Sequence, residues 1–282
     1  MDLRERRRCY AEEIETIANL KSPALVEAFA HVPRERFLPP GPWLIRSEVD
    51  YGGGPRQTPD DDPRRVYHNI AIAIEPVRQL FNGAPSLVGM CIDALALGPG
   101  MRVLHVGCGT GYYSAVIAHA VGSRGAVTAV EIDEALAETA RRNLADTEWI
   151  HVRHGNGTDV PAESFDAILV NAGMTHPHES WLAALRPGGR LLLPLTFTAP
   201  GMGTIGKGVM ALLTRDGETW SARVVTMTVI YSAVDLRDER MNERIRDAFM
   251  KGGLPAFNRM RRDSHEPSAS CWLHDDTFCF SK

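Results

Sequence analysis

The chain has 282 residues, of which 44% are hydrophobic and 23% are charged, and this composition is typical of a soluble globular protein with a sizeable core. Its formal net charge of −4 gives no global attraction to nucleic acid, and no apolar run approaches the length of a membrane span. We therefore expect neither nucleic acid nor a membrane as a partner. The five cysteines form no CxxC pair and are odd in number, which favours reduced thiols and a cytoplasmic location over a disulfide framework.

The N-terminal segment, Met1 to Ala30, is helical in pattern, and Pro23 is placed to open a second helix within it. The residues predicted to share the buried face of the first helix are Tyr10, Ile14, Ile17 and Leu20. A proline- and glycine-rich passage follows Pro39 and runs to Pro63. It is too irregular for a helix or a strand, so we expect a loop there.

Regular patterns return after Tyr67. An apolar segment runs from Ile70 to Ile74, and a turn at Phe81–Ser86 precedes a predicted helix from about Ser86 to Leu97. The glycines around Pro99 then end that helix.

The stretch from Met101 to Asp133 organises the rest of the chain. An apolar run, Val103–Val106, leads into a glycine turn, Gly107–Gly111, and a helical pattern follows from Tyr112 to Val121. A second apolar run then ends at Glu131. This order predicts strand, glycine turn, helix and strand, the unit of a parallel α/β sheet.

The spacing of the glycines selects the kind of ligand. A phosphate-binding P-loop would need Gly-Lys-Ser/Thr at the end of the turn, and a dinucleotide fingerprint would need a glycine at Tyr112. The remaining pattern, GxGxG, suits a nucleoside without a pyrophosphate. Glu131 lies 20 residues past Gly111 (131 − 111), where a carboxylate can accept both hydroxyls of a ribose. This arrangement resembles the S-adenosylmethionine (SAM) site of class I methyltransferases.

Predicted helices and strands continue to alternate after Glu131. We expect a helix over Glu134–Ala145, a third strand over Ile150–Arg153, a fourth over Phe165–Val170, a helix around Trp181–Leu185 and a fifth strand over Arg190–Pro194. Antiparallel strands are predicted at Val209–Leu213 and Val224–Tyr231, around the Asp216–Gly217 turn. A polar helix over Asp238–Met250 and an apolar tail complete the chain, and we expect the tail to pack back on the domain.

Five motifs occur in an order that resembles protein-L-isoaspartate O-methyltransferase, over roughly Ser22 to Leu195. They are Val32–Leu38 (VPRERFL), the Ala84–Pro85 turn, the GxGxG stretch, Gly155–Asn156–Gly157 and Pro187–Leu191 (PGGRL). The resemblance implies an α/β class I methyltransferase fold: a doubly wound, mainly parallel sheet with a helical N-terminal addition and an antiparallel C-terminal extension. It implies residues 1–97 as an N-terminal region contributing to the substrate site, 98–200 as a Rossmann-like SAM-binding core, and 201–282 as strands, helix and tail packed on that core.

The resemblance also implies the site residues. The cofactor set is Ala84, Ser86, His105, Gly107, Gly109, Gly111, Glu131, Ile132, Asn156, Gly157 and Asn171. The substrate set is Tyr67, His68, Asn82, Gly83 and Ser86. Three positions depart from the family pattern. Gly83 stands where the family has a serine followed by a small residue and a proline, His105 replaces an acid on the first sheet strand, and Asn156 replaces an adenine-contacting aspartate.

The methyl acceptor decides which groups catalysis needs. A carboxylate is already ionised at neutral pH, so it needs alignment but no base. We expect such an acceptor on a small molecule or a modified peptide. A hydroxyl acceptor would instead need a base such as His176, His178 or His68.

Two further alternatives stay open. The fold could serve as a SAM-binding module without turnover, or as a nucleic-acid methyltransferase, although Asn171–Ala172–Gly173–Met174 lacks the prolines and aromatic residue that end strand four in adenine-methylating enzymes. No metal-ligand constellation stands out, so no metal is expected. The sequence does not determine the oligomeric state.

Overall fold

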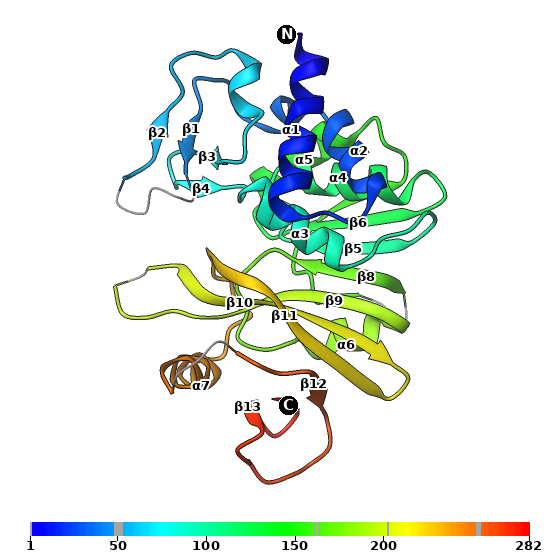
Figure 1. Ribbon diagram of the computed structural model, residues 1–282, viewed down its shortest axis with the longest axis vertical. Helices are drawn as coiled ribbons and strands as arrows, with labels where there is room; N and C mark the ends of the chain where they lie inside the picture. The colour runs from blue at the N-terminus through cyan, green and yellow to red at the C-terminus, as the bar shows by residue number, and fades with distance from the viewer. Residues whose placement is uncertain (1, 48–52, 161, 163, 202, 252–254) are drawn as a thin grey trace. The chain divides into compact units, whose positions relative to one another are not determined.

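The structure is a computed structural model that describes residues 2–47, 53–160, 162, 164–201, 203–251 and 255–282. The chain divides into two compact units. Unit 1 comprises residues 1–101 and 108–155, and unit 2 comprises residues 102–107 and 156–282. Figure 1 shows the elements of both units in chain order.

The helices of unit 1 are α1 (Leu3–Ala18), α2 (Pro23–His31), α3 (Pro85–Ala94), α4 (Tyr112–Val121) and α5 (Glu134–Leu144). Asp2 and Glu5 form a capping box that starts α1, and Asn19, with φ of 51°, ends it. The predicted second helix is confirmed as α2, which Ser22 caps. Tyr10, Ile14 and Leu20 are buried as predicted, but Ile17 is 52% exposed, so its assignment to the buried face is wrong.

The passage from Pro39 to Pro63 is more regular than the predicted loop. It contains β1 (Leu44–Arg46) and β2 (Arg56–Gln57), while residues 48–52 lie outside the described part of the chain. With β3 (Ala71–Glu75) and β4 (Leu80–Phe81) these strands form an antiparallel sheet of order β2-β1-β3-β4. The short 3-10 helices η1 (Arg34–Phe37) and η2 (Pro63–Val66) flank it. β1 is extended because it pairs with the apolar β3, and β2 because it pairs with β1. This is a tertiary effect that the local sequence pattern does not show.

Unit 1 also contains a parallel strand pair, β6 (Ala126–Glu131) and β7 (Ile150–His154). The pair places Glu131 opposite His154 at the carboxyl end of both strands. Helix α5 connects the two strands and begins at Asp133, whose side chain accepts the Leu136 N–H. The predicted strand and helix over Val127–Ala145 are thus confirmed.

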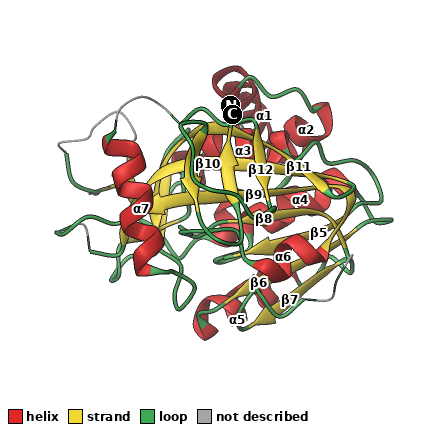
Figure 2. Cartoon of the chain, turned by 90° about the horizontal axis from the view of Figure 1, so that it is seen from below, coloured by secondary structure: helices red, strands yellow, loops and turns green. Residues whose placement is uncertain are grey.

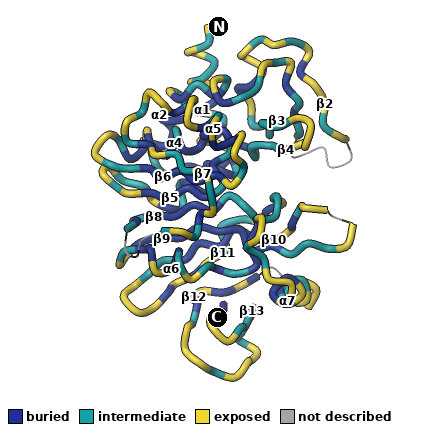
Figure 3. Tube along the Cα trace, turned by 180° about the vertical axis from the view of Figure 1, so that it is seen from behind, coloured by how far each residue is buried: buried dark blue, intermediate teal, exposed yellow. Residues whose placement is uncertain are grey.

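Unit 2 is built on a sheet in which β5 (Arg102–Val106), β8 (Phe165–Val170) and β9 (Leu185–Phe197) are parallel. Antiparallel strands β10 (Ile205–Asp216) and β11 (Thr219–Tyr231) extend it beyond β9, as predicted. Figure 2 shows these long strands with α6 (Glu179–Ala184) and α7 (Glu239–Met250). Figure 3 shows buried residues along β8 and β9. The apolar run Ala167–Val170 of β8 is at most 1% exposed.

The C-terminal tail is part of unit 2 and extends its sheet. Strands β12 (Arg259–Arg261), β13 (Cys271–His274) and β14 (Cys279–Ser281) continue the sheet from β11 in the order β11-β12-β14-β13. Phe249 of α7 contacts Trp272 of β13, with ring centroids 5.7 Å apart. No helix in the described residues combines the length and apolar character needed to cross a membrane.

Candidate functional site

The glycine turn lies between β5 and α4, where the sequence places it. Gly107, Gly109 and Gly111 have φ of 76°, 57° and 97°, a region that strains any residue with a Cβ. A Cβ on Gly109 would lie 2.9 Å from Ile74 Cδ1, and one on Gly111 would lie 2.8 Å from Leu144 Cδ1. Bare backbone is therefore required by both conformation and space.

Glu131 turns its carboxylate to this backbone. The Gly109 N–H donates to Glu131 Oε2 over 2.8 Å, and the Asp133 N–H donates to Oε1 over 3.1 Å. Glu131 is 7% exposed. An ionised carboxylate has about four acceptor positions, so two remain for further donors. Next to it Ile132 is 45% exposed, an unusual position for a large apolar side chain.

These features of unit 1 fit a nucleoside. The turn offers close approach without side chains, Glu131 offers oxygen acceptors suited to a pair of sugar hydroxyls, and Ile132 offers an apolar contact for a flat ring.

The Val32–Leu38 motif packs against the glycine turn and holds it through hydrogen bonds and a ring contact. Thr110 Oγ1 donates to the Phe37 carbonyl over 2.6 Å, and Asn143 Nδ2 donates to the Thr110 carbonyl over 2.9 Å. The Phe37 ring packs edge-on against Tyr112, with centroids 5.7 Å apart. The motif thus fixes the turn between η1 and α5.

Arg34, at the centre of the same motif, is fully buried. Its guanidinium lies 5.8 Å from the Tyr10 and Tyr112 ring centroids. It donates to three backbone carbonyl oxygens at 2.7 to 3.0 Å, those of Val66, His68 and Ile70. Arg34 is therefore a positioning residue for the segment that carries the predicted substrate set. Arg34 is not among the predicted site residues, because a charged residue in an irregular stretch gives no periodic signal.

Tyr67 and His68, predicted to bind substrate, have local partners in this segment. Tyr67 is fully buried, its hydroxyl donates to the Glu35 carboxylate, and it accepts the Arg34 N–H over 3.1 Å. Burial and the hydrogen bond to Glu35 raise the pKa of Tyr67 above its ordinary value. The His68 ring lies 2.7 Å from Arg6 Nη2, and burial, together with this cation, lowers the pKa of His68.

The remaining members of the predicted substrate set surround the start of α3. Asn82 Oδ1 accepts the Ile72 N–H over 3.1 Å, while its Nδ2 is buried without a hydrogen-bond partner in the described residues. Gly83 has φ of 77° and its carbonyl accepts from Tyr113 over 3.2 Å. Ala84 is the N-cap and provides no side-chain cap for the helix, and Ser86 is buried.

Unit 2 carries the other predicted cofactor residues. His105 is buried within β5, and burial lowers its pKa to about 4. A Cβ on Gly107 would lie 3.2 Å from the Asn171 carbonyl oxygen, and one on Gly157 would lie 2.5 Å from Val106. Asn156 Oδ1 accepts from both the N–H and the hydroxyl of Thr158, at 3.0 and 2.9 Å. An amide oxygen has two lone pairs, and the two Thr158 donors already occupy both of them. The hydrogen bond predicted from an adenine amino group would therefore compete with these two bonds.

The predicted bases His176 and His178 follow β8 and precede α6. His178 is the N-cap of α6, where its Nδ1 accepts the Ser180 N–H over 3.3 Å. His176 Nδ1 lies 2.9 Å from Thr175 Oγ1. Burial lowers the pKa of both imidazoles, which favours their neutral forms.

One cluster of possible metal ligands was not predicted from the sequence. His265, Cys271, His274 and Cys279 bring their nitrogen and sulfur atoms together near the C-terminus. Their mixed spacing matches none of the paired motifs by which metal sites are usually found in a sequence.

Comparisons with known proteins extend this description. Residues 56–229 match the family model described as protein-L-isoaspartate(D-aspartate) O-methyltransferase. A protein-L-isoaspartate O-methyltransferase from Methanothrix thermoacetophila is 36% identical over 186 residues, 64% of this chain and 78% of that protein. One from Methanopyrus kandleri is 32% identical over 197 residues, 68% of this chain and 77% of that protein.

Solved structures show the same fold. A protein-L-isoaspartate O-methyltransferase structure aligns with a TM-score of 0.59 at 20% identity, covering 99% of this chain and 88% of its own. A Plasmodium falciparum structure of the same description, in complex with S-adenosyl-L-homocysteine, aligns with a TM-score of 0.59 at 17% identity, covering 80% and 97%. The predicted class I methyltransferase fold is confirmed. The chain belongs to the protein-L-isoaspartate(D-aspartate) O-methyltransferase family and is an enzyme that uses SAM as its methyl donor.

Proposed function

We propose that this enzyme transfers the methyl group of SAM to a carboxylate of a peptide or protein, with the free carboxylate of an isoaspartyl residue as the first acceptor class. The observation that carries the proposal is the family match over residues 56–229, which includes the glycine turn and Glu131. The relatives from Methanothrix thermoacetophila and Methanopyrus kandleri are both named for action on L-isoaspartate. A peptide takes precedence here over the small-molecule acceptor that the sequence analysis left open.

The proposed roles in unit 1 follow from its contacts. When bound, SAM supplies an electrophilic methyl group on a sulfonium sulfur. Glu131 accepts the ribose hydroxyls with the two oxygen positions that Gly109 and Asp133 leave open, and Ile132 packs on the adenine. The cofactor residues predicted in unit 2 remain part of the proposal: His105, Gly107, Asn156, Gly157 and Asn171.

The substrate side needs orientation and no base. Arg34 fixes the backbone of residues 66–70, and Asn82 offers a buried amide N–H₂ that has no partner in the described residues. A carboxylate is an acceptor for such a donor. Because an ionised carboxylate is already nucleophilic at neutral pH, alignment with the donor and exclusion of water are sufficient for the reaction. His178 supports this reading, since its Nδ1 caps α6.

The proposal is tested with methyl-labelled SAM and three acceptors: an isoaspartyl peptide, the matched aspartyl peptide and a phenol. A methyl ester releases methanol in mild base, whereas an aryl methyl ether is stable. We expect base-labile label on the isoaspartyl peptide, and an unchanged pH profile in His176→Ala. Label that resists base, found on the phenol and lost in His176→Ala, would establish the hydroxyl alternative. SAM binding without transfer to any acceptor would favour the non-catalytic alternative.

A further inference from the structure

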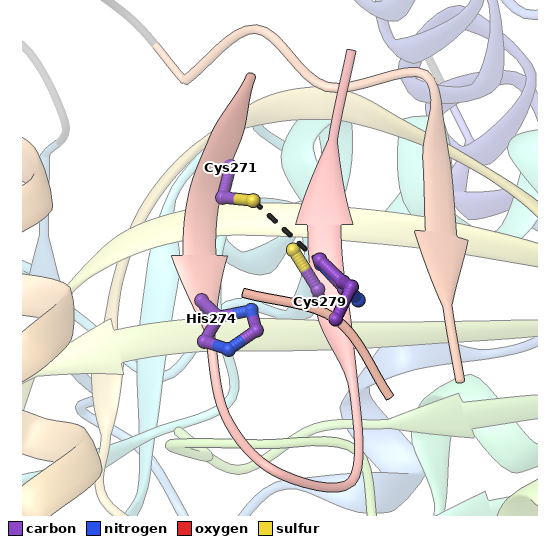
Figure 4. Close-up of side chains that lie close together, drawn as sticks. Cys271, His274 and Cys279 are labelled. Carbon is purple, nitrogen blue, oxygen red and sulfur yellow. Dashed lines mark hydrogen bonds between the residues drawn. The ribbon is translucent and has the colours of Figure 1, made fainter. Parts of the chain in front are cut away.

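The C-terminal end of unit 2 gathers four potential metal ligands that the methyl-transfer chemistry does not use. One ligand atom from each of His265, Cys271, His274 and Cys279 lies within 4.8 Å of all the others. Figure 4 shows Cys271, His274 and Cys279 converging from β13 and β14. All five cysteines of the chain are free thiols in the structure.

A β-bulge brings Cys271 and His274 to one face of the hairpin. In regular strands, residues three apart point to opposite faces. Here the register shifts between Cys271 and Leu273, so that Cys271 pairs with Ser281 while His274 pairs with Cys279. The extra residue restores a common face for the three ligands of the hairpin.

His265 approaches this face from the segment between β12 and β13. Its Nδ1–H donates to the Asp263 carbonyl over 2.9 Å, and its Nε2 lies 3.7 Å from Cys271 Sγ. A donor hydrogen bond at Nδ1 leaves the Nε2 lone pair free for a metal, which is the usual second interaction of a metal-binding histidine.

His274 supplies an independent sign of a missing partner. Its Nδ1 is buried and has no hydrogen-bond partner among the described residues. The His274 and His265 rings meet edge to face, with centroids 4.7 Å apart. A buried imidazole nitrogen without a partner is destabilising unless a ligand satisfies it.

Cys271 also has the surroundings of a metal thiolate. Its Sγ lies 3.4 Å from the Ser268 backbone nitrogen and 3.5 Å from the Ser268 hydroxyl oxygen. Such donors stabilise negative charge on sulfur and orient a thiolate ligand.

We infer that His265, Cys271, His274 and Cys279 form a structural Zn²⁺ site. Two thiolates and two imidazoles are a closed tetrahedral set for this ion, with bonds of about 2.3 Å to sulfur and about 2.0 Å to nitrogen. The donor atoms of such a tetrahedron are about 3.3 to 3.8 Å apart, so the cluster needs only a small contraction. Two thiol protons leave on binding, and the resulting site is neutral.

The ion would hold the tail in place. Residues 262–270 contain no helix or strand, and His265 is the ligand that comes from this segment. Coordination therefore links this segment to the β13–β14 hairpin, which pairs with β12. Because four protein ligands leave no open position, we assign the ion a folding role and no catalytic one.

The test is metal analysis of the purified, tag-free full chain prepared with zinc and without chelators. We expect one zinc ion per chain in the wild type, and less than about a tenth of that in Cys271→Ser and in Cys279→Ser. Cys9→Ser is the matched control, since Cys9 is an exposed thiol on α1, and it should keep the ion.

A second measurement does not depend on the variants folding. Wild-type protein stripped with chelator and reloaded with Co²⁺ should acquire the ligand-field and thiolate charge-transfer absorption of a tetrahedral sulfur-ligated site, and zinc should abolish it. Three results would each overturn the proposal: wild-type protein that is prepared with zinc and holds none, equal zinc in wild type and Cys271→Ser, or a Cys271–Cys279 disulfide peptide in reductant-free protein.

Discussion

The backbone N–H of Gly109 donates to the Glu131 carboxylate over 2.8 Å, joining the glycine turn to the carboxyl end of β6 within unit 1. One residue thus both shapes the turn and presents the acceptor oxygens that the proposed ribose contact requires.

Replacing Glu131 with alanine should weaken SAM binding by about 100-fold or more, because two hydrogen bonds to a charged acceptor are lost, each of about 1.5–3 kcal/mol. Calorimetric titration of SAM or S-adenosylhomocysteine measures the change. Glu134→Ala is the control, as Glu134 is exposed in the first turn of α5 and should leave the affinity unchanged. Equal affinity in wild type and Glu131→Ala would show that the nucleoside binds elsewhere.

Gly109→Ala should destabilise the protein more than Gly203→Ala. The two glycines share nearly the same φ, 57° and 58°, so the backbone strain of about 1–2 kcal/mol is common to both. Only at Gly109 would the new Cβ meet a neighbour, Ile74 Cδ1 at 2.9 Å, and such overpacking adds about 1–3 kcal/mol. Urea unfolding gives both values. Adding Ile74→Val, which removes that Cδ1 atom, should recover part of the loss in Gly109→Ala, and an absence of recovery would contradict the assigned collision.

Arg34→Lys should lower the free energy of unfolding by about 2–4 kcal/mol, since an ammonium group does not reproduce the fork that reaches three carbonyls. Arg36→Lys is the matched control. The Arg36 side chain is 42% exposed and pairs with the exposed Asp146, so its change should stay within about 0.5 kcal/mol. Comparable losses in the two variants would argue against a special role for Arg34. Because Arg34 acts through the segment it holds, its variant should also raise KM for peptide more than it lowers kcat.

Stability should fall as the pH drops from about 6.5 to 4, and His105 is one cause. Burial lowers its folded-state pKa to about 4, whereas the unfolded chain takes up the proton near 6.5. Between these values the unfolded state binds more protons, so a contribution of roughly 3 kcal/mol, fully present above pH 6.5, is lost. Urea unfolding at pH 7.5 and pH 4.5 should show a smaller difference for His105→Gln than for wild type. His151→Gln, at an exposed position of β7, should keep the wild-type difference, and a full difference in His105→Gln would assign the pH dependence to other groups.

Much of the fold was predictable because it rests on local patterns. The apolar runs of β5, β6 and β8, the glycine turn, helix α4 and the capped helix α5 are encoded by residues close in sequence. The strands β1 and β2 were not predicted, since β1 is extended by pairing with β3 and β2 by pairing with β1. The predicted burial of Ile17 was wrong for a related reason. Helical periodicity places a residue on a face of the helix, but the neighbouring helices decide how much of that face is buried.

The sequence by itself determined the donor, because the glycine turn and the acid that ends β6 need only short spacings and backbone chemistry. It also determined the family, through the order of five short motifs along the chain. Only the tertiary structure decided that buried Arg34 donates to three backbone carbonyls and that the Tyr67 hydroxyl donates to Glu35. These hydrogen bonds join residues separated by some 32 to 36 positions. It also decided that a bulge turns Cys271 and His274 to one face beside Cys279 and His265. Register and side-chain burial are settled by packing across the whole unit, and no local window of residues contains that information.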